Sequence, residues 1–559
     1  MTEYSKYDEA RESFDWNLPE KYNPAFDCVQ KHSSKPEDRT ALIDAATERH
    51  YTFSEIDNAA SQLANALLEL GIEVGDRVGV VAPQRPETPI SHTALWMIGA
   101  VTIPLTTLFG QDALAFRLDD SEAKAVIYDP IVRDDLAKAS AQCNQLEAVI
   151  ELGPTPWYLS KTSKDDSTKN ESSKSFHCEQ YDYENLVAGR ETSIQTYAST
   201  PETDSVIMYT SGSTGPPKGV RHSHALWLGR AAAAYNFFNC GLDNENAVSW
   251  TPADWAWGSA LGGLLMGSWH HGTPVVAAPM QGFDSTSVFT LCEDHKISHA
   301  LIPPTALRML MAENPKEYDL NLSAVATAGE PLTPEILDWS DESFEDLAIN
   351  EYYGQTELNL VVANVSRWFE VQPGSMGKAL PGYDVTILDR ETYEELPHGE
   401  IGEIAVRPHD ECVFFDEYLN RPEATVSKQV GDWYLTNDLG SRDHDGYFWF
   451  ESRADDIIIT SGYRVGPLEV EEVLLDHPAV KQAGVIGIPD EMRGEIIKAY
   501  IEPTPETDPD DELRGNLRQR ARDRLAEYEY PRQIEFVDSL PMTTSGKIQR
   551  VKLRERYSN

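Results

Sequence analysis

A segment rich in glycine and hydroxyl side chains, Tyr209 to Gly219, carries the strongest chemical signal in this chain. It reads YTSGSTGPPKG and follows the apolar run DSVIM. Its glycines let the backbone approach an anion, its hydroxyls donate hydrogen bonds, and Lys218 supplies a positive charge. A Walker A loop needs Ser or Thr after its lysine, whereas Gly219 follows Lys218 here. The segment therefore predicts a phosphate-binding loop of another kind.

Further motifs follow this loop in a fixed order, and they identify a family. They are AGEPL (328–332), EYYGQTE (351–357), YLTNDL (434–439), RADDI (453–457) with SGYR (461–464) after it, and PMTTSGKI (541–548). Together with the loop they resemble the motifs of the acyl-adenylate-forming superfamily of acyl-CoA synthetases, adenylation domains and luciferases. The resemblance spans about residues 40–555. Within this superfamily, the motifs are most similar to those of the medium-chain acyl-CoA synthetases.

The resemblance implies a large set of ATP-binding residues, and most of them come from three motifs. They are Thr210, Ser211, Gly212, Ser213, Thr214, Gly215, Pro216, Pro217 and Lys218; Gly329, Glu330 and Pro331; Glu351, Tyr352, Tyr353, Gly354, Gln355 and Thr356; and Asp438, Arg453, Arg464 and Lys547.

Three of the implied residues would act on the reacting groups. Thr356 would bond the α-phosphate, and Glu357 would hold Mg²⁺, which prefers carboxylate and phosphate oxygens. Lys547 would bridge the acid's carboxylate and the α-phosphate as the acyl-adenylate forms. Asp438 would accept both ribose hydroxyls. The family's usual glycine before this aspartate is replaced by Asn437, a residue that tolerates the left-handed backbone conformation.

The second half-reaction, transfer of the acyl group to CoA, would use other residues. Asp455 matches the hinge about which family members rotate their C-terminal domain. The implied CoA-binding residues are Ser461, Gly462, Tyr463, Arg493, Tyr530, Pro531 and Arg532. An arginine suits the nucleotide phosphates of CoA because it can bind them with two parallel hydrogen bonds.

The acid itself is the least defined substrate. Expected acyl-pocket residues are Trp255, Trp257, Gly258, Gly354 and Val361. Acetate-specific relatives place a tryptophan at the position of Gly354, so a glycine there predicts room for a medium-chain or branched fatty acid. A short-chain or aryl acid, and loading of a carrier protein instead of CoA, remain alternatives; a luciferase-like oxygenase and an inactive nucleotide or acyl-chain binder are less favoured.

Composition excludes several function classes. The 559 residues include 47 basic and 92 acidic side chains, a formal charge of −45. This surface would repel nucleic acid and anionic lipid, so we expect neither as a partner, and it favours adaptation to a salty cytosol. The stretch Thr93–Phe109 is too short and interrupted to span a membrane.

The remaining features point to a cytoplasmic protein of mixed α/β architecture. Six scattered cysteines without a zinc spacing indicate reduced thiols, mostly in the core, and the acidic N-terminus has no apolar segment typical of a signal peptide. Alternating strand and helix patterns predict helix-covered parallel sheets, with a helix over 54–70 capped by Ser54, buried strands in DRVGVVAP, AVIYDP and AVIEL, and a helix running into a strand in SHTALWMIGAVTIPL. Later in the chain, DHDG predicts a hairpin turn, LEVEEVLLDHPAV a helix, and QAGVIGIPD and KAYIEP two strands. We expect an N-terminal domain (1–452) with a surface loop at 158–185, a hinge (453–456) and a small α/β C-terminal domain (457–559) carrying Lys547.

Overall fold

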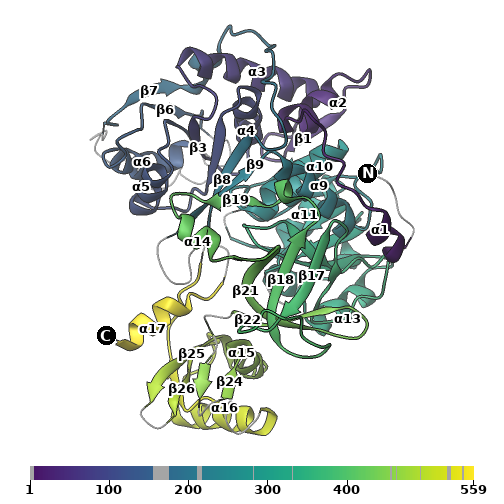
Figure 1. The fold of residues 1–559 in the computed structure, drawn as a ribbon, viewed down its shortest axis with the longest axis vertical. Helices are drawn as coiled ribbons and strands as arrows, with labels where there is room; N and C mark the ends of the chain where they lie inside the picture. The colour runs from purple at the N-terminus through teal and green to yellow at the C-terminus, as the bar shows by residue number, and fades with distance from the viewer. Residues whose placement is uncertain are drawn as a thin grey trace. The chain divides into compact units, whose positions relative to one another are not determined.

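A computed structural model describes most of the chain (Figure 1). The described residues are 6–154, 175–210, 217–280, 282–329, 332–453, 456, 458–460, 463–490, 493–525, 530–543 and 547–558. The chain divides into two compact units, which we describe separately. Unit 1 is Met1–Thr210, Lys218–Asp384 and Pro408–Ser427; unit 2 is Ser211–Pro217, Val385–Arg407 and Lys428–Asn559. The hinge at 453–456 and its flanking domain boundaries stay predictions.

One of the two sheets in unit 1 has eight strands and a largely parallel centre. Its order is β19-β9-β8-β4-β3-β5-β6-β7. The apolar runs predicted as buried strands form β3, β4, β5 and β6, which confirms those predictions. The bounds are β3 Arg77–Val81, β4 Val101–Leu105, β5 Ala125–Tyr128, β6 Ala148–Glu151, β7 Glu179–Asp182, β8 Asp204–Thr210, β9 Lys218–Ser223 and β19 Phe415–Tyr418.

The other sheet of unit 1 runs in the order β16-β15-β14-β13-β12-β10-β11-β1-β2. Strands β1 and β10 to β14 pair in parallel, and β2, β15 and β16 add antiparallel edges. The bounds are β1 Thr40–Asp44, β2 Arg49–Thr52, β10 Ser249–Trp250, β11 Val275–Ala277, β12 His299–Leu301, β13 Ala324–Thr327, β14 Ala348–Gly354, β15 Leu360–Ala363 and β16 Ser375–Ala379.

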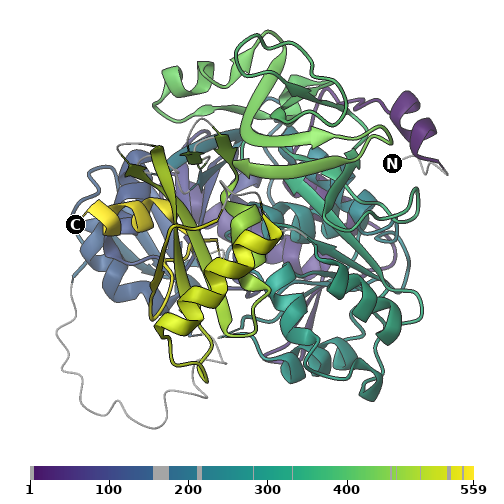
Figure 2. The same ribbon diagram turned by 90° about the horizontal axis from the view of Figure 1, so that it is seen from below.

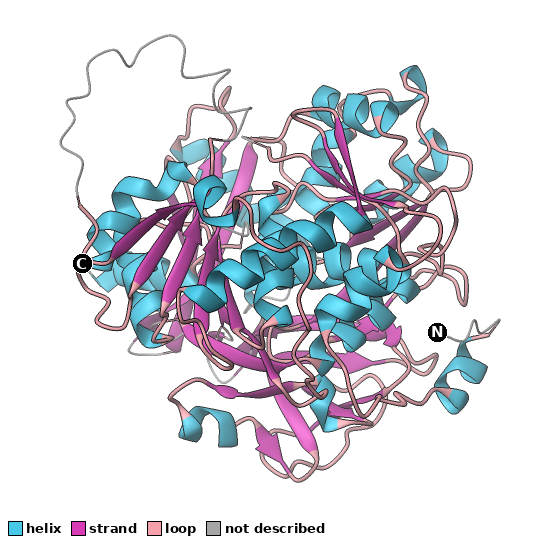
Figure 3. Cartoon of the chain, turned by 90° about the horizontal axis from the view of Figure 1, so that it is seen from above, coloured by secondary structure: helices cyan, strands magenta, loops and turns pink. Residues whose placement is uncertain are grey.

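Helices cover both sheets, as Figure 3 shows. Helices α3 and α4 lie between them, because α3 contacts β1, β2 and α4, while α4 contacts β3 and β4. The bounds are α1 Tyr7–Ser13, η1 Phe26–Gln30, α2 Lys31–Ser33, α3 Phe53–Glu69, α4 Glu87–Met97, α5 Gln111–Asp120, η2 Pro130–Val132, α6 Arg133–Ser140, α8 Tyr183–Val187, α9 Ala225–Phe237, η4 Ser259–Met266, α10 Gly267–His271, α11 Ser285–Asp294, α12 Pro304–Leu310, η5 Pro315–Glu317, α13 Pro334–Ser343, η6 Glu411–Val413 and α14 Pro422–Val426.

Helix α3 confirms the predicted helix but corrects its cap. Thr52, not Ser54, is the N-cap: its hydroxyl accepts from the Glu55 N–H, and the Glu55 carboxylate accepts from the Thr52 N–H. This reciprocal pair is a capping box, which satisfies two of the backbone groups that a helix start leaves without partners.

The predicted surface loop at 158–185 is partly wrong. Residues 158–174 lie outside the described residues, but β7 and the first residues of α8 occupy 179–185. Strand β7 pairs in parallel with β6 at the edge of the sheet. A polar edge strand lacks the apolar pattern by which a strand is recognised in a sequence, because it faces solvent.

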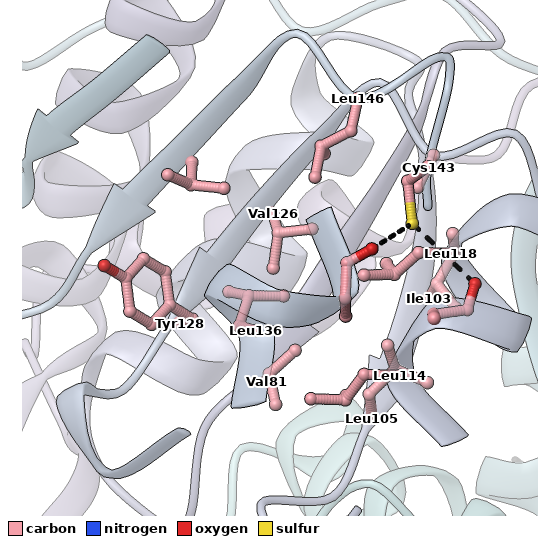
Figure 4. Close-up of a cluster of buried hydrophobic side chains, with 14 of the residues drawn as sticks. Val81, Ile103, Leu105, Leu114, Leu118, Val126, Tyr128, Leu136, Cys143 and Leu146 are labelled. Carbon is pink, nitrogen blue, oxygen red and sulfur yellow. Dashed lines mark hydrogen bonds between the residues drawn. The ribbon is translucent and has the colours of Figure 1, made fainter. Parts of the chain in front are cut away.

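The eight-stranded sheet is held by an apolar core (Figure 4). Strand residues such as Val81, Ile103 and Val126 pack there against Leu114 and Leu136 of helices α5 and α6. Cys143 joins this core, where its thiol donates to the Ala115 and Ala139 carbonyls. Cys28, Cys240 and Cys292 are also buried, as predicted for core thiols.

Unit 2 contains two smaller sheets (Figures 1 and 2). In one, β17-β18-β21-β22 are neighbours and β20 pairs with β21; in the other, β24-β23-β26-β25 are neighbours and β27 pairs with β26. The strand bounds are β17 Tyr383–Leu388, β18 Gly402–Pro408, β20 Gln429–Val430, β21 Trp433–Arg442, β22 Phe448–Arg453, β23 Ile458–Thr460, β24 Tyr463–Val465, β25 Val480–Asp490, β26 Gly494–Pro503 and β27 Gln533–Phe536. The helices of this unit are α15 Pro467–Leu475, α16 Asp511–Arg524 and α17 Arg550–Ser558.

Sequence patterns located several elements of unit 2 correctly. Strands β21 and β22 form the hairpin predicted around the turn DHDG, and α15, β25 and β26 lie where a helix and two strands were expected. The mixed α/β fold class is therefore confirmed. Within the described part of the chain, no helix combines the length and the apolar character needed to cross a lipid bilayer.

Candidate functional site

The strands that flank the predicted phosphate loop are well defined. β8 and β9 pair in antiparallel fashion, with Thr210 opposite Lys218 and Tyr209 opposite Gly219. The Tyr209 hydroxyl donates to the Asp120 carboxylate at 2.9 Å, which ties the end of β8 to helix α5. Residues 211–216, which include the predicted Ser211, Gly212, Ser213, Thr214, Gly215 and Pro216, lie outside the described residues.

Lys218 and Glu357 both contact one tyrosine that sequence reasoning missed, Tyr418. The Lys218 ammonium lies 4.8 Å from the centre of the Tyr418 ring, a cation–π distance. The Tyr418 hydroxyl donates to Glu357 Oε1 at 2.6 Å. Strand β19 places this tyrosine opposite Val220 of β9. A predicted phosphate-binding lysine and a predicted metal ligand thus share one rigid aromatic neighbour.

Thr356 is held through its backbone by a buried histidine. His222 Nε2 on β9 donates to the Thr356 carbonyl at 2.7 Å. Burial lowers the pKa of His222 to about 3, so this imidazole is neutral at physiological pH. Strand β9 therefore positions both Thr356 and, through its pairing with β19, Glu357.

Parallel strands β13 and β14 end beside each other and carry two predicted ATP-binding segments. Thr327 of β13 lies opposite Glu351 of β14, so the segment containing Gly329 and the motif after Glu351 begin at one edge of the sheet. Ligands of parallel sheets bind outside this edge. Gly329 has a φ of +96°, which favours glycine. Glu330 and Pro331 lie outside the described residues.

Glu351 is a buried carboxyl that supports the segment after β13. Its Oε2 accepts from the Leu332 N–H at 2.9 Å. Burial raises the pKa of Glu351 to about 8, against the lowering effect of this hydrogen bond. The carboxyl is therefore largely protonated at neutral pH, and the structure gives it a positioning contact within the protein.

The other residues of this motif face different surroundings. Tyr352 is buried and stacks on Phe237, with ring centres 4.7 Å apart, whereas Tyr353 and Gln355 are partly exposed. Gly354 is packed against backbone: a Cβ there would lie 2.4 Å from the Asn359 carbonyl oxygen. The close approach of two chain segments thus requires this glycine, independently of any space that it leaves for an acyl chain.

The expected acyl-pocket residues come from two places in unit 1. Trp255 is fully buried, Trp257 and Gly258 are partly exposed, and all three follow Asp254. The Asp254 carboxylate accepts from Thr106 Oγ1 at 2.6 Å and from the Ala256 N–H at 2.9 Å, which fixes this turn. Val361 is buried on β15.

In unit 2, the predicted ribose-binding residues lie on adjacent strands. Asp438 of β21 is opposite Arg453 of β22, and Arg453 Nε is 3.1 Å from Asp438 Oδ1. Asn437 adopts a φ of +58°, which confirms that it takes the left-handed conformation. Its N–H donates to Glu403 Oε1 at 2.9 Å. The replacement of the family's glycine therefore preserves a turn that orients Asp438.

Lys547 lies just before α17 and is tied to Thr543. The Lys547 N–H donates to Thr543 Oγ1 at 2.9 Å, and the Lys547 carbonyl accepts from the Thr543 N–H at 2.7 Å. Three residues later, the partly buried Arg550 pairs with Glu471 of α15 (2.6 Å) and with Asp456 (3.2 Å). The backbone of Lys547 is thus held on both sides, while its side chain is exposed.

Three of the predicted CoA-binding residues come together. The guanidinium groups of Arg522 and Arg532 lie 4.3 and 4.8 Å from the centre of the Tyr530 ring. A hydrogen bond with Arg522, followed by the charges of Arg532, Arg522 and Arg493, lowers the pKa of the Tyr530 hydroxyl. Pro531, between Tyr530 and Arg532 in the chain, is buried. Arg522, on α16, extends the predicted set.

Some predicted residues cannot be placed in this way. Asp455, Ser461 and Gly462 lie outside the described residues, and Tyr463 and Arg464 are described only as backbone of β24. Among the described residues no group of three or more histidine, cysteine, aspartate or glutamate side chains could hold a metal ion. Mg²⁺ bound by Glu357 would need phosphate oxygens and water to complete its coordination, which is common for this ion.

The site residues that sequence reasoning missed are Tyr418, His222 and Arg522. Each acts beside a motif residue, from a segment that carries no motif of its own. The only available signals were the positions of His222 directly after the phosphate loop and of Arg522 in an arginine-rich helix. No pattern in EYLNRPEAT marked Tyr418.

Comparison with protein-family models matches two parts of the chain. Residues 29–414 match the AMP-binding enzyme model, and residues 469–547 match the model of the AMP-binding enzyme C-terminal domain.

Similar proteins span nearly the whole chain. The mitochondrial acyl-coenzyme A synthetase ACSM3 of Mus musculus is 33% identical, over 99% of this chain and 93% of that protein. The mitochondrial acyl-coenzyme A synthetase ACSM4 of Homo sapiens is 34% identical, over 96% and 91%. The crystal structure of the anthranilate CoA ligase AuaEII with anthranoyl-AMP has a TM-score of 0.83 and 27% identity, over 98% of this chain and 99% of that one.

Burial of Glu351 generates a pH prediction. Its pKa is about 8 in the folded protein against an ordinary value of 4.5, so the folded state binds the proton more tightly. The stabilisation is complete below pH 4.5 and is lost as pH rises through about 8. In Glu351→Gln, which keeps an oxygen acceptor for the Leu332 N–H, this contribution disappears. Denaturant unfolding at pH values from about 5 to about 9 measures it, and an unchanged difference between the two proteins across that range would contradict the assignment.

The contact between Tyr418 and Glu357 generates a prediction on activity. Tyr418→Phe keeps the ring beside Lys218 but removes a hydrogen bond to a carboxylate, which contributes about 1.5–3 kcal/mol in proteins. We expect acid-dependent ATP–pyrophosphate exchange to slow about tenfold or more and to require a higher Mg²⁺ concentration.

The matched control for Tyr418→Phe is Tyr22→Phe. Tyr22 also donates to a carboxylate of unit 1, Asp27, at 3.0 Å, but it contacts no motif residue. Equal exchange rates and equal Mg²⁺ requirements in the two variants would contradict a role for Tyr418 in the site.

Proposed function

Because this chain belongs to the AMP-binding enzyme family, we propose that it is an AMP-forming acid:CoA ligase. It joins a carboxylic acid to ATP, giving acyl-AMP and pyrophosphate, and then transfers the acyl group to CoA with release of AMP. The observation that carries this proposal is the gathering of Lys218, Thr356 and Glu357 around β9 and β19, described above. Full-length similarity to named acyl-coenzyme A synthetases supports it.

In the first half-reaction each motif residue has a role that its surroundings allow. Lys218 and the loop before it bind the phosphates of ATP, Thr356 bonds the α-phosphate, and Glu357 holds Mg²⁺. The metal neutralises phosphate charge when bound. Asp438 accepts from the ribose hydroxyls beside Arg453, which lies 3.1 Å away. Lys547 stabilises the negative charge that develops as the acid's oxygen attacks phosphorus.

In the second half-reaction the arginines around Tyr530 receive CoA. Arg493, Arg522 and Arg532 converge on one side chain in a protein that has about twice as many acidic as basic residues, 92 against 47. A local positive patch on such a surface favours a phosphorylated ligand. Rotation about the hinge at Asp455, with Ser461, Gly462 and Tyr463 lining the path of the thiol arm, belongs to the same proposal.

The acid is proposed to be a medium-chain or branched fatty acid. The similarity of the sequence motifs to those of medium-chain acyl-CoA synthetases supports this choice, and the two relatives named above are acyl-coenzyme A synthetases. The anthranilate ligase supports an aryl acid as the second candidate, since that enzyme was captured with anthranoyl-AMP. A cytoplasmic location and salt adaptation are also proposals, drawn from the cysteines and from the formal charge of −45.

A direct assay tests the ligase proposal. Purified protein is incubated in high salt with ATP, Mg²⁺, CoA and straight-chain, branched or aryl acids, and AMP is measured. We expect AMP to form only when an acid is present, with CoA accelerating its release. Release that depends on a phosphopantetheinyl protein instead of CoA would favour the carrier-loading alternative, and no AMP with any acid would reject a ligase.

Lys547 gives this assay a sharper form. Lys547→Ala should lower acid-dependent ATP–pyrophosphate exchange by orders of magnitude, because the developing charge loses its cation. Thioester formation from supplied acyl-adenylate should largely survive. Lys552→Ala, an exposed lysine of α17 in the same unit, is the matched control. Retained exchange in Lys547→Ala would contradict the role.

The charge of −45 predicts stabilisation by salt. Like charges repel over a screening length of about 10 Å in 0.1 M salt and about 3 Å in 1 M salt, so concentrated KCl should relieve repulsion in the folded state. We expect a clearly higher melting temperature in molar KCl than in dilute buffer. Equal melting temperatures in both would sink the proposal of salt adaptation.

A further inference from the structure

Arg230 is a buried cation without a carboxylate partner. It lies on α9 in unit 1 and is 2% exposed. No aspartate or glutamate of the described residues forms an ion pair with it, although the chain has 92 acidic side chains. Its one hydrogen bond is long, from Nη2 to the Leu358 carbonyl at 3.5 Å, and its Nε has no partner. Burial lowers the pKa of Arg230 to about 10, which still leaves it charged at neutral pH.

Two buried tyrosine hydroxyls, those of Tyr352 and Tyr383, interact electrostatically with Arg230. Neither makes a hydrogen bond of good geometry: Tyr352 has only a weak contact with Ser259, and Tyr383 only a weak contact with Asn359. Burial raises the pKa of both tyrosines, and the charge of Arg230 acts against that rise. The Asn359 amide nitrogen donates to the Val413 carbonyl at 2.6 Å, which fixes the orientation of the amide. Buried groups of this kind normally have partners, and a buried charge without one is costly.

The chemistry of these atoms is that of an anion site. The guanidinium Nε–H and two hydroxyls are donors, and only one atom, the Asn359 oxygen, is obligatorily an acceptor. Arg230 therefore offers a positive charge and an N–H with nothing to accept from it, beside two hydroxyls whose own contacts are weak. A carboxylate or a halide would satisfy both requirements.

The position of Arg230 connects it to the predicted acid-binding residues. Arg230 Nη2 is 3.7 Å from the position that a Cβ on Gly258 would occupy. Arg230 Cγ is 3.0 Å from the position that a Cβ on Gly262 would occupy, so the aliphatic part of the side chain packs against Gly262. Leu358, whose carbonyl it reaches, is two residues after Thr356. We propose that Arg230, with Tyr352 and Tyr383, binds an anion at the acyl end of the site, in catalysis the second carboxylate of a dicarboxylic acid.

This inference rests on the proposed ligase function for its choice of substrate, but the anion site itself can be tested without turnover. One anion chemistry has two possible sources, the distal carboxylate of the acid or a free halide. The experiment compares the wild type with Arg230→Met and Arg230→Lys. Its first arm measures kcat/KM for AMP formation with hexanoate against adipate and octanoate against suberate. Its second arm measures melting temperature in KCl against potassium gluconate at equal ionic strength.

We expect the wild type to prefer the dicarboxylic acids, and the ratio of kcat/KM for dicarboxylate over monocarboxylate to fall at least tenfold in Arg230→Met, with partial recovery in Arg230→Lys. A melting temperature that rises with chloride in the wild type, but not in Arg230→Met, supports the same site with a free halide as its occupant. Identical acid preference and identical chloride response in wild type and Arg230→Met would overturn the inference.

Stability separates this inference from a folding defect and from failure of the ligase proposal. Replacing an unpaired buried charge with methionine should not lower the melting temperature, because the desolvation cost disappears. The control is Arg85→Met: Arg85 is 6% exposed and pairs with Asp129 at 2.7 Å, so its loss should destabilise. A similar loss in Arg230→Met would show that Arg230 is satisfied internally and would overturn the inference. If no acid yields AMP, the chloride arm still decides whether the anion site exists.

Discussion

The pairing of β9 with a strand on each side is the constraint on which the predicted phosphate-binding region of unit 1 depends. On one side β8 fixes Thr210 opposite Lys218, and on the other β19 brings Tyr418 beside Val220. His222, on the same strand, holds the Thr356 carbonyl. A three-stranded ladder therefore sets the positions of a lysine, a threonine and a carboxylate that lie up to 139 residues apart in the sequence, from Lys218 to Glu357.

Buried ionisable groups show how this protein divides charge between structure and chemistry. Burial keeps His222 neutral and raises the pKa of Glu351, and both side chains hold backbone groups of motif segments. Arg550 is instead neutralised by ion pairs with two carboxylates, those of Asp456 and Glu471. Paired or neutral groups of this kind support the fold, which is why Arg230, charged and without a carboxylate, stands out as a group that awaits a ligand.

Sequence patterns predicted the motifs and much of the fold, because both depend on local residue order. Buried strands such as β3 and β5, and the β21–β22 hairpin, have apolar or turn signals that extend over only a few residues. Polar β7 carries no such signal, and the cap of α3 was placed two residues too late. Sequence patterns could not predict contacts between distant segments. Tyr418 and Glu357 are 61 residues apart, and no pattern near either residue indicates the other.

The close packing of Gly354 shows a related limit. A glycine in a binding motif suggests space for a substrate, yet here a neighbouring carbonyl occupies the direction in which a side chain would extend. Only the three-dimensional arrangement distinguishes a glycine that makes room for a ligand from one that makes room for the chain itself.

The contacts of Lys547 with Thr543 have an entropic consequence. The Lys547 N–H already donates to the Thr543 hydroxyl, the Lys547 carbonyl already accepts from the Thr543 N–H, and Arg550 fixes the helix that follows. Placing the Lys547 ammonium for reaction then costs mainly the rotamer freedom of one side chain, about 2 kcal/mol, because the backbone of Lys547 itself is already held.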